Sequence, residues 1–352
     1  MTAAAGTDQS PESAPSSPRI AYLDNARFWA MILVVVGHPL FHFISLSSGR
    51  AVYYWIYLVH MPLFALLSGY ISRNFRATPQ QIERTVSTLV IPYFLIEPLY
   101  QVLHRHYRGT SDPYMLLSPK WIAWFLAALF IWRLSTPIWR NLRHPILVSI
   151  LISLLVPLTE VPNVLALPKA LGMLPFYVIG MHMTMERFQR LSAARVRIVS
   201  IVFLAAVATV SALYSRGWDV SWTKWRHRYS ESALSVGPWE GMALRSVLIV
   251  VGVLMCLAIL SLVPWKQSWT SPLGERTLYC YLLHGFVVLL LAEETHVFAE
   301  LRALGWVGLA VTVAAAAVVA VLLMTKPVAM LFRPLFEANL NWAFKSRDRL
   351  PA

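Results

Sequence analysis

The sequence has little charge and almost no cysteine. Only 13% of its 352 residues are Asp, Glu, Lys or Arg, whereas a soluble globular domain carries about 25%. The two cysteines, Cys256 and Cys280, both lie inside apolar stretches, so the chain has neither a disulfide framework nor the cysteine spacing of a metal site. The shortage of charge indicates that lipid, rather than water, surrounds most of the chain.

Several common catalytic motifs are also missing. The sequence contains no Gly-x-Ser-x-Gly elbow, no His-Glu-x-x-His, no Walker loop and no glycosidase-like pair of carboxylates. These absences argue against a serine hydrolase, a zinc protease and an ATP-driven pump, and we expect no metal. The net charge of +13 could suggest nucleic acid. The basic residues form short clusters between apolar runs, however, so we expect no nucleic-acid partner.

Long apolar runs dominate what remains. The chain is 57% hydrophobic, and its mean hydropathy is +0.58. A helix needs about 20 largely apolar residues to cross a bilayer, and ten stretches approach that length. The sequence therefore predicts an all-α polytopic membrane bundle of about ten transmembrane helices. The expected spans are 26–46, 52–72, 86–104, 120–138, 145–160, 168–186, 197–215, 243–263, 276–294 and 304–325, of which the fifth is the weakest because Pro145 and Pro157 bracket a short run.

The distribution of basic residues predicts the orientation of the bundle. We expect a disordered cytoplasmic tail over 1–22, a membrane domain over 23–326 and a cytoplasmic C-terminal tail over 327–352. Of the 30 Lys and Arg residues, 19 then fall on the side of the N-terminus. The long loop 216–245 holds five of the others, and long loops count little for orientation. Both termini are therefore expected in the cytoplasm, with the protein in the cell membrane.

The first predicted helix carries two basic side chains that lipid should not tolerate unless they have partners or a function. Arg27 and His38 are 11 residues apart, which is about three turns plus 20° and about 16 Å along a helix. We expect both to face one cavity, with Asp24 capping the helix and pairing with Arg27, and Pro39 kinking it. The alternatives are a histidine bonded between packed helices and an arginine that only anchors the topology.

The segment 22–38 resembles the opening of the acyltransferase type 3 family, membrane proteins that O-acylate sugars and other acceptors. The signature of that family is an Arg or Lys, ten residues and then a His, and Arg27 with His38 fits it. Four further blocks resemble the family in the same order along about residues 20–325: 60–70, Arg73 with Arg76, 124–129 and 273–284.

The resemblance implies a ten-helix fold and an acyl-CoA co-substrate, most often acetyl-CoA. The chain is most similar to a short, core-only branch that includes sugar O-acetylases. Arg73 and Arg76 are expected to bind the phosphates of the co-substrate, since guanidinium groups suit phosphate oxygens, or else they only enforce topology. His38 would act as a general base, which we favour, or would carry the acyl group transiently.

Four further residues are candidates for the substrate cavity. The resemblance points to His60, Tyr281 and His284, and Glu97 is an intramembrane carboxylate that could orient a histidine. Each of them could instead be structural. The tryptophan-rich loop 216–245 is open to two interpretations: it lies at the membrane interface as an aromatic belt, or it covers an acceptor site.

The function that these features favour is transfer of an acyl group, most often acetyl, from acyl-CoA to a hydroxyl of a carbohydrate or glycosylated acceptor. The expected partners are therefore the lipid bilayer, acyl-CoA and that acceptor. A secondary transporter or exporter of a small anionic or acylated molecule could use the same histidine and arginines along a translocation path. A third possibility is a scaffold for a biosynthetic complex, in which these side chains would tolerate replacement.

Overall fold

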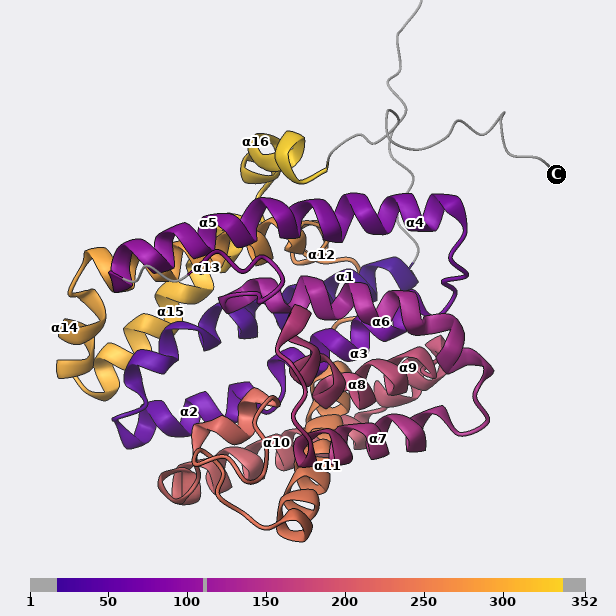
Figure 1. Ribbon diagram of the computed structural model, residues 1–352, viewed down its shortest axis with the longest axis horizontal. Coiled ribbons are helices and arrows are strands. Elements are labelled where there is room, and N and C mark those ends of the chain that lie inside the picture. The colour runs from indigo at the N-terminus through magenta and orange to yellow at the C-terminus, as the bar shows by residue number, and fades with distance from the viewer. Residues whose placement is uncertain (1–17, 110–112, 338–352) are drawn as a thin grey trace, which may run out of the picture.

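A computed structural model describes residues 18–109 and 113–337, which form α-helices joined by short turns and contain no β-strand (Figure 1). The helices are α1 (Pro18–Gly37), α2 (Ser47–Tyr57), α3 (His60–Ser72), α4 (Pro79–Thr85), α5 (Ile91–Arg108), α6 (Trp124–Asn141), α7 (Pro145–Leu155), α8 (Leu167–Met181), α9 (Met185–Leu191), α10 (Ala194–Tyr214), α11 (Pro238–Leu262), α12 (Ser271–Gly274), α13 (Thr277–Glu294), α14 (Val297–Ala303), α15 (Trp306–Leu323) and α16 (Lys326–Phe336).

The helices confirm the predicted all-α membrane bundle and refine its count. In the described residues, nine helical stretches are long and apolar enough to cross a membrane. The remaining predicted span, 145–160, is a shorter apolar helix over Pro145–Leu158. Pro145 begins that helix, and Pro157 lies in the 3-10 turn that ends it, because proline suits a first turn and disrupts a helix interior.

Helices extend into both of the segments that are predicted as tails. α1 begins at Pro18, inside the tail expected over 1–22, and residues 1–17 lie outside the described residues. At the other end, α16 extends into the segment 327–352. The remainder of that segment, 338–352, also lies outside the described residues.

The surface of the bundle is apolar where a soluble protein would be polar. α10 is the clearest case, since Ile198, Val199 and Leu213 each expose more than 60% of their surface. Exposed apolar area of this extent is costly in water but not in lipid. The outward faces therefore fit a multi-pass membrane protein, and lipid contact explains why α10 has little amphipathic pattern.

α3 and α8 are in direct backbone contact. A Cβ added to Gly69 would lie 1.9 Å from the carbonyl oxygen of Tyr177, and one added to Gly180 would lie 2.0 Å from that of Leu66. The two backbones therefore touch, as small residues allow in membrane helix pairs. This contact holds α3 beside α8.

The two ends of the bundle are fastened by different loops. At the end where α1 begins, which we call the start end, the side chain of Asn25 forms hydrogen bonds of 2.6–3.1 Å with the loop 263–276. Tyr22 and Tyr70 both contact the ring of Phe188, so α3 ends at the start end too.

The opposite end, which we call the far end, is covered by longer loops. Arg50 on α2 donates to the carbonyl oxygens of Ser215 (2.7 Å) and Trp218 (2.5 Å), which ties the loop 215–237 to α2. The helix α14 lies at this end, away from α4 and α9 (Figure 1).

Candidate active site

A cavity of about 570 Å³ lies at the far end of the bundle. This volume is typical of small-molecule sites. Its wall contains histidines, aromatic side chains and cations. The relevant side chains are His38, His42, Tyr53, Tyr57, His60, Tyr100, His104, Lys120, Trp121, Trp124, Lys169, Lys224, Arg226, Tyr281 and Glu293.

His38 enters the cavity because α1 ends directly before it. The amide of His38 still donates to the carbonyl oxygen of Val34 at 3.3 Å, but Pro39 has no amide hydrogen and cannot continue the α-helix. A 3-10 turn, η1 (Pro39–Phe43), follows instead. The expected kink in one helix over 26–46 is therefore a helix end, which turns the chain at His38.

His38 and His60 line the cavity, and a further histidine, His284, lies beside His38. The ring centroids of His38 and His284 are 5.0 Å apart. The Nδ1 atoms of His60 and His284 each lie 2.9 Å from a backbone carbonyl oxygen, those of Ile56 and Cys280. A carbonyl can only accept, so Nδ1 carries the proton and the Nε2 atom of each neutral ring is an acceptor.

His284 stands out within this group. Its side chain is fully buried, and its Nε2 atom has no hydrogen-bond partner within the described part of the chain. A buried polar atom without a partner is costly and calls for an explanation. Across residues 18–109 and 113–337, no group of three or more His, Cys, Asp or Glu side chains could hold a metal ion.

Tyr281 and Glu97, the other two candidates for the substrate cavity, both form hydrogen bonds with the backbone of the wall segment 120–122. Tyr281 lines the cavity, and its hydroxyl donates to the carbonyl oxygen of Ile122. The Glu97 carboxylate is buried, but it accepts from the backbone amide of Lys120 (2.9 and 3.0 Å) and from Gln101 (2.8 Å). The expectation that Glu97 orients a histidine is therefore wrong. It holds the segment that carries Lys120 into the wall.

Arg27 lies away from the cavity. Its expected ion pair with Asp24 is confirmed at 2.8 Å. Asp24 is not a helix cap, however, because α1 begins six residues earlier, at Pro18. The helical spacing of about 16 Å separates Arg27 from His38 along the axis, and Arg27 is not part of the cavity wall. The structure therefore does not bring Arg27 and His38 into one cavity.

Arg73 and Arg76 also lie at the start end, beyond the end of α3. Arg73 donates to the carbonyl oxygen of Tyr70 at 2.6 Å, and its guanidinium carbon lies 3.9 Å from the centre of that ring. Arg76 is exposed. Neither side chain lines the cavity, so phosphate binding by these two residues stays a prediction about a separate surface.

Sequence reasoning missed the cations of the cavity, of which Lys169 on α8 is the deepest. Its ammonium nitrogen lies 4.0 Å from the centre of the Trp124 ring, and it is within electrostatic range of His38 and His60. A lysine inside the apolar stretch 168–186 is a signal that could have identified it. Lys120 comes from a loop, where no periodic pattern in the sequence predicts which way a side chain points.

The loop 215–237 supplies the rest of the far-end wall. Thr223, Lys224 and Arg226 line the cavity, so this loop forms part of the cavity wall, and both interpretations of the loop stay open. Buried Arg245 on α11 holds the loop in place by donating to the carbonyl oxygen of Trp225 at 3.0 Å.

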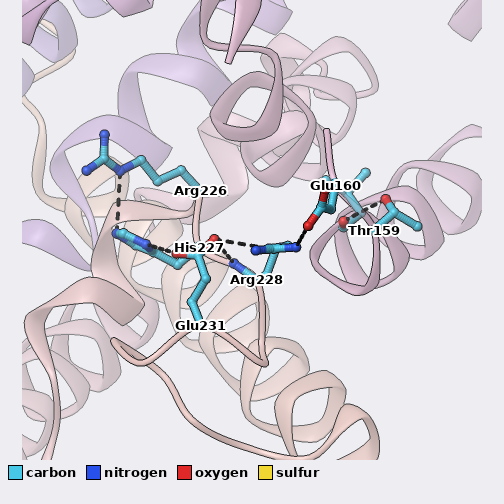
Figure 2. A network of polar contacts seen from close by, with 7 residues as sticks. Thr159, Glu160, Arg226, His227, Arg228 and Glu231 are labelled. Atoms are coloured by element: carbon cyan, nitrogen blue, oxygen red, sulfur yellow. Dashed lines mark hydrogen bonds and ion pairs between the residues drawn. The ribbon is translucent and has the colours of Figure 1, made fainter. Parts of the chain in front are cut away.

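A polar network fastens the next part of this loop (Figure 2). His227 donates to Glu231 at 2.7 Å and accepts from Arg226 at 3.4 Å. Arg228 pairs with Glu160 and lies 3.5 Å from Glu231. Burial and the charge of Arg226 lower the pKa of His227, although its bond to Glu231 acts in the opposite direction. The neutral ring is therefore the form that the network holds.

Comparison with known protein families gives one match. A family model described as an acyltransferase domain matches residues 20–325. The match runs from α1 through α15. No curated protein and no solved structure matches the chain.

Proposed function

The chain belongs to this acyltransferase family, and we propose that it transfers an acyl group, most often acetyl, from acyl-CoA to a hydroxyl of a carbohydrate or glycosylated acceptor. Family membership supports acyl transfer in general. The observation that carries the proposal is that His38 and His60 line one far-end cavity, while the ring of His284 lies 5.0 Å from that of His38.

His38 is the general base of the proposed reaction. It takes the proton from the acceptor hydroxyl as that oxygen attacks the thioester carbonyl carbon. A C–O bond forms, the C–S bond breaks, and the proton passes from His38 to the departing thiolate, which leaves as free CoA. The direct transfer keeps the acyl group off the protein.

The neighbouring histidines prepare His38 for this role. The unpartnered Nε2 of His284 can accept the N–H of the adjacent His38 ring, which leaves the other ring nitrogen of His38 as a proton acceptor. His60, fixed by its bond to Ile56, presents a second acceptor nitrogen with which the substrate hydroxyl can align before transfer.

The donor is proposed to approach from the start end. We propose that both termini are cytoplasmic and that this end faces the cytosol, where acyl-CoA is found. Arg73 and Arg76 would then hold its phosphates, and the long pantetheine arm would carry the thioester inward toward His38. The acceptor would use the cavity at the far end, so that the two substrates meet at His38.

Replacing His38 tests the proposal directly. His38→Ala should abolish transfer of labelled acetyl from acetyl-CoA to envelope glycan or added acceptor, while expression and melting temperature stay unchanged. His144→Ala is the matched control, because His144 is exposed in the turn before α7 and does not line the cavity. Normal transfer by His38→Ala would remove His38 from the mechanism.

Detergent-solubilised protein separates an enzyme from a transporter. A micelle holds no gradient, so covalent transfer of label under these conditions supports an acyltransferase. Gradient-dependent flux in vesicles, without any covalent product in either preparation, would overturn the proposal and favour transport of an anionic or acylated molecule.

A further inference from the structure

Several cations in the cavity wall have no carboxylate partner. Lys169, Lys224 and Arg226 all line the cavity, and none of them takes part in an ion pair within residues 18–109 and 113–337. Glu293 is the one acidic side chain among the residues that line this cavity, and it is exposed at the rim. The wall therefore carries an excess of positive charge.

Arg228, two residues after Arg226, shows that a cation in the same loop can be paired with carboxylates. Arg228 is paired with Glu160 and Glu231 (Figure 2). These three residues also line a second cavity of about 450 Å³. Arg226 lines both cavities, yet among residues 18–109 and 113–337 its side chain bonds only to the acceptor nitrogen of His227. Lys169, Lys224 and Arg226 thus have no ion-pair partner among the described residues, whereas Arg228 has two.

The electrostatic environment of Lys224 favours binding of an anion. Burial and the nearby charge of Arg226 lower its pKa, and Asp219 only partly offsets them. Like charges held this close in a partly desolvated wall repel each other. A bound carboxylate or phosphate would relieve the repulsion and gain charge-assisted hydrogen bonds.

We propose that Lys169, Lys224 and Arg226 form an anion-binding subsite that takes the carboxylate or phosphate of an acidic carbohydrate acceptor. This inference rests on the proposed function and names its acceptor class. Trp121 and Trp124 line the same cavity as the cations, so the wall also offers aromatic surface for a sugar ring. The phosphates of CoA share this anion chemistry, and the test separates the two sources.

Calorimetry on the solubilised full-length protein measures the subsite without any turnover. The probes are glucuronate, glucose 6-phosphate and neutral glucose. At least one acidic sugar should bind about tenfold or more tightly than glucose, and that binding should weaken as salt is added. Equal binding of the charged and neutral sugars, or no binding of either acidic sugar, overturns the proposal.

Charge-neutral variants locate the subsite. Lys169→Met and Lys224→Met should each weaken binding of the acidic sugar by about 10- to 100-fold, since each removes a charge-assisted bond. Lys266→Met is the control, because this exposed lysine lies in the start-end loop. Lys224 is on a loop, so its variant keeps the test valid if Lys169→Met does not fold. Unchanged affinity in a folded Lys224→Met or Lys169→Met protein refutes the assignment.

Coenzyme A titrated against the same variants distinguishes the two anion sources. An unchanged affinity for CoA supports an acceptor subsite, whereas a parallel loss of CoA affinity shows that the cations hold donor phosphates and overturns it. The proposed acyl transfer fails on a different result, the lack of label transfer by the unaltered protein, which sugar binding does not affect.

Discussion

The contact between α3 and α8 allows a sharp prediction about the scaffold of the site. A methyl group added at Gly69 would lie 1.9 Å from the carbonyl oxygen of Tyr177, whereas ordinary contact begins at 3.4 Å. The two helices must therefore separate by about 1.5 Å, the difference between these distances. The obstacle is backbone, so no side chain can rotate aside to make room.

The cost follows from this geometry. Overpacking a closed contact costs about 1–3 kcal/mol, and we expect the upper part of that range for Gly69→Ala. The better helix propensity of alanine offsets up to about 1 kcal/mol. At about 2.1 cal/mol/K of unfolding entropy per residue, the net loss of about 2 kcal/mol should lower the apparent melting temperature in detergent by roughly 3 °C.

Two comparisons make the Gly69 prediction specific. Gly217→Ala is the control, since nothing lies within 4 Å of a Cβ at that position, and its melting temperature should match that of the unaltered protein. Gly180→Ala meets the carbonyl oxygen of Leu66 at 2.0 Å on the same contact. The double variant should lose less stability than the two single losses added together, because one separation of the helices accommodates both methyls. If Gly69→Ala has the same melting temperature as Gly217→Ala, the close approach of α3 and α8 is refuted.

Two further predictions concern the two ends of the bundle. Arg73→Ala should raise the KM for acyl-CoA by about tenfold with little change in kcat, because it removes a phosphate contact made equally in the ground and transition states; an unchanged KM would place the donor elsewhere. The pKa of His227 is lowered by burial and by Arg226, so His227 is protonated more easily when the loop is open than when it is closed. His227 therefore stabilises the closed loop fully above about pH 6.5, and this stabilisation is lost as the pH falls toward the lowered pKa. Hydrogen exchange in residues 226–231, corrected for intrinsic rates, should therefore quicken between about pH 7 and 5, and His227→Gln should remove this dependence; an equal response in both proteins would exclude His227 as its source.

The fold could be predicted from sequence because lipid imposes a simple rule. Apolar length alone indicates a span, and it identified the membrane helices well. It failed for 145–160, where two prolines shorten the helix, and at Pro39, where a kink was expected and α1 ends. Both differences have a common cause, since proline limits a helix according to its exact position, while hydropathy averages over about 20 residues.

The candidate site was predictable only in part. His38, His60, Tyr281 and His284 lie in or beside one cavity, and family blocks rather than spacing pointed to them. Helical spacing placed Arg27 on the same face as His38, but a shared face does not make a shared cavity when about 16 Å of helix separates the two residues.

The cavity cations show what remained out of reach of sequence. Lys169 carried a signal, a charge inside an apolar stretch, that was not used. Lys120 and Lys224 carried none, because their positions depend on long-range contacts. The Glu97 carboxylate fixes the backbone of Lys120, and Arg245 holds the carbonyl of Trp225, next to Lys224. Such contacts join residues that no local pattern relates.

The positive charges of the far-end loop bear on orientation as well as on binding. The loop 216–245 holds five of the eleven Lys and Arg residues that lie opposite the N-terminal side, which would weaken a charge-based orientation. Four of these five have local roles in the structure: Lys224 and Arg226 line the cavity, Arg228 is paired with Glu160, and Arg245 binds the loop backbone. Charges retained for a site say little about which side of a membrane they occupy. Setting the loop aside leaves 19 against 6, so the loop that forms the cavity wall does not count against cytoplasmic termini.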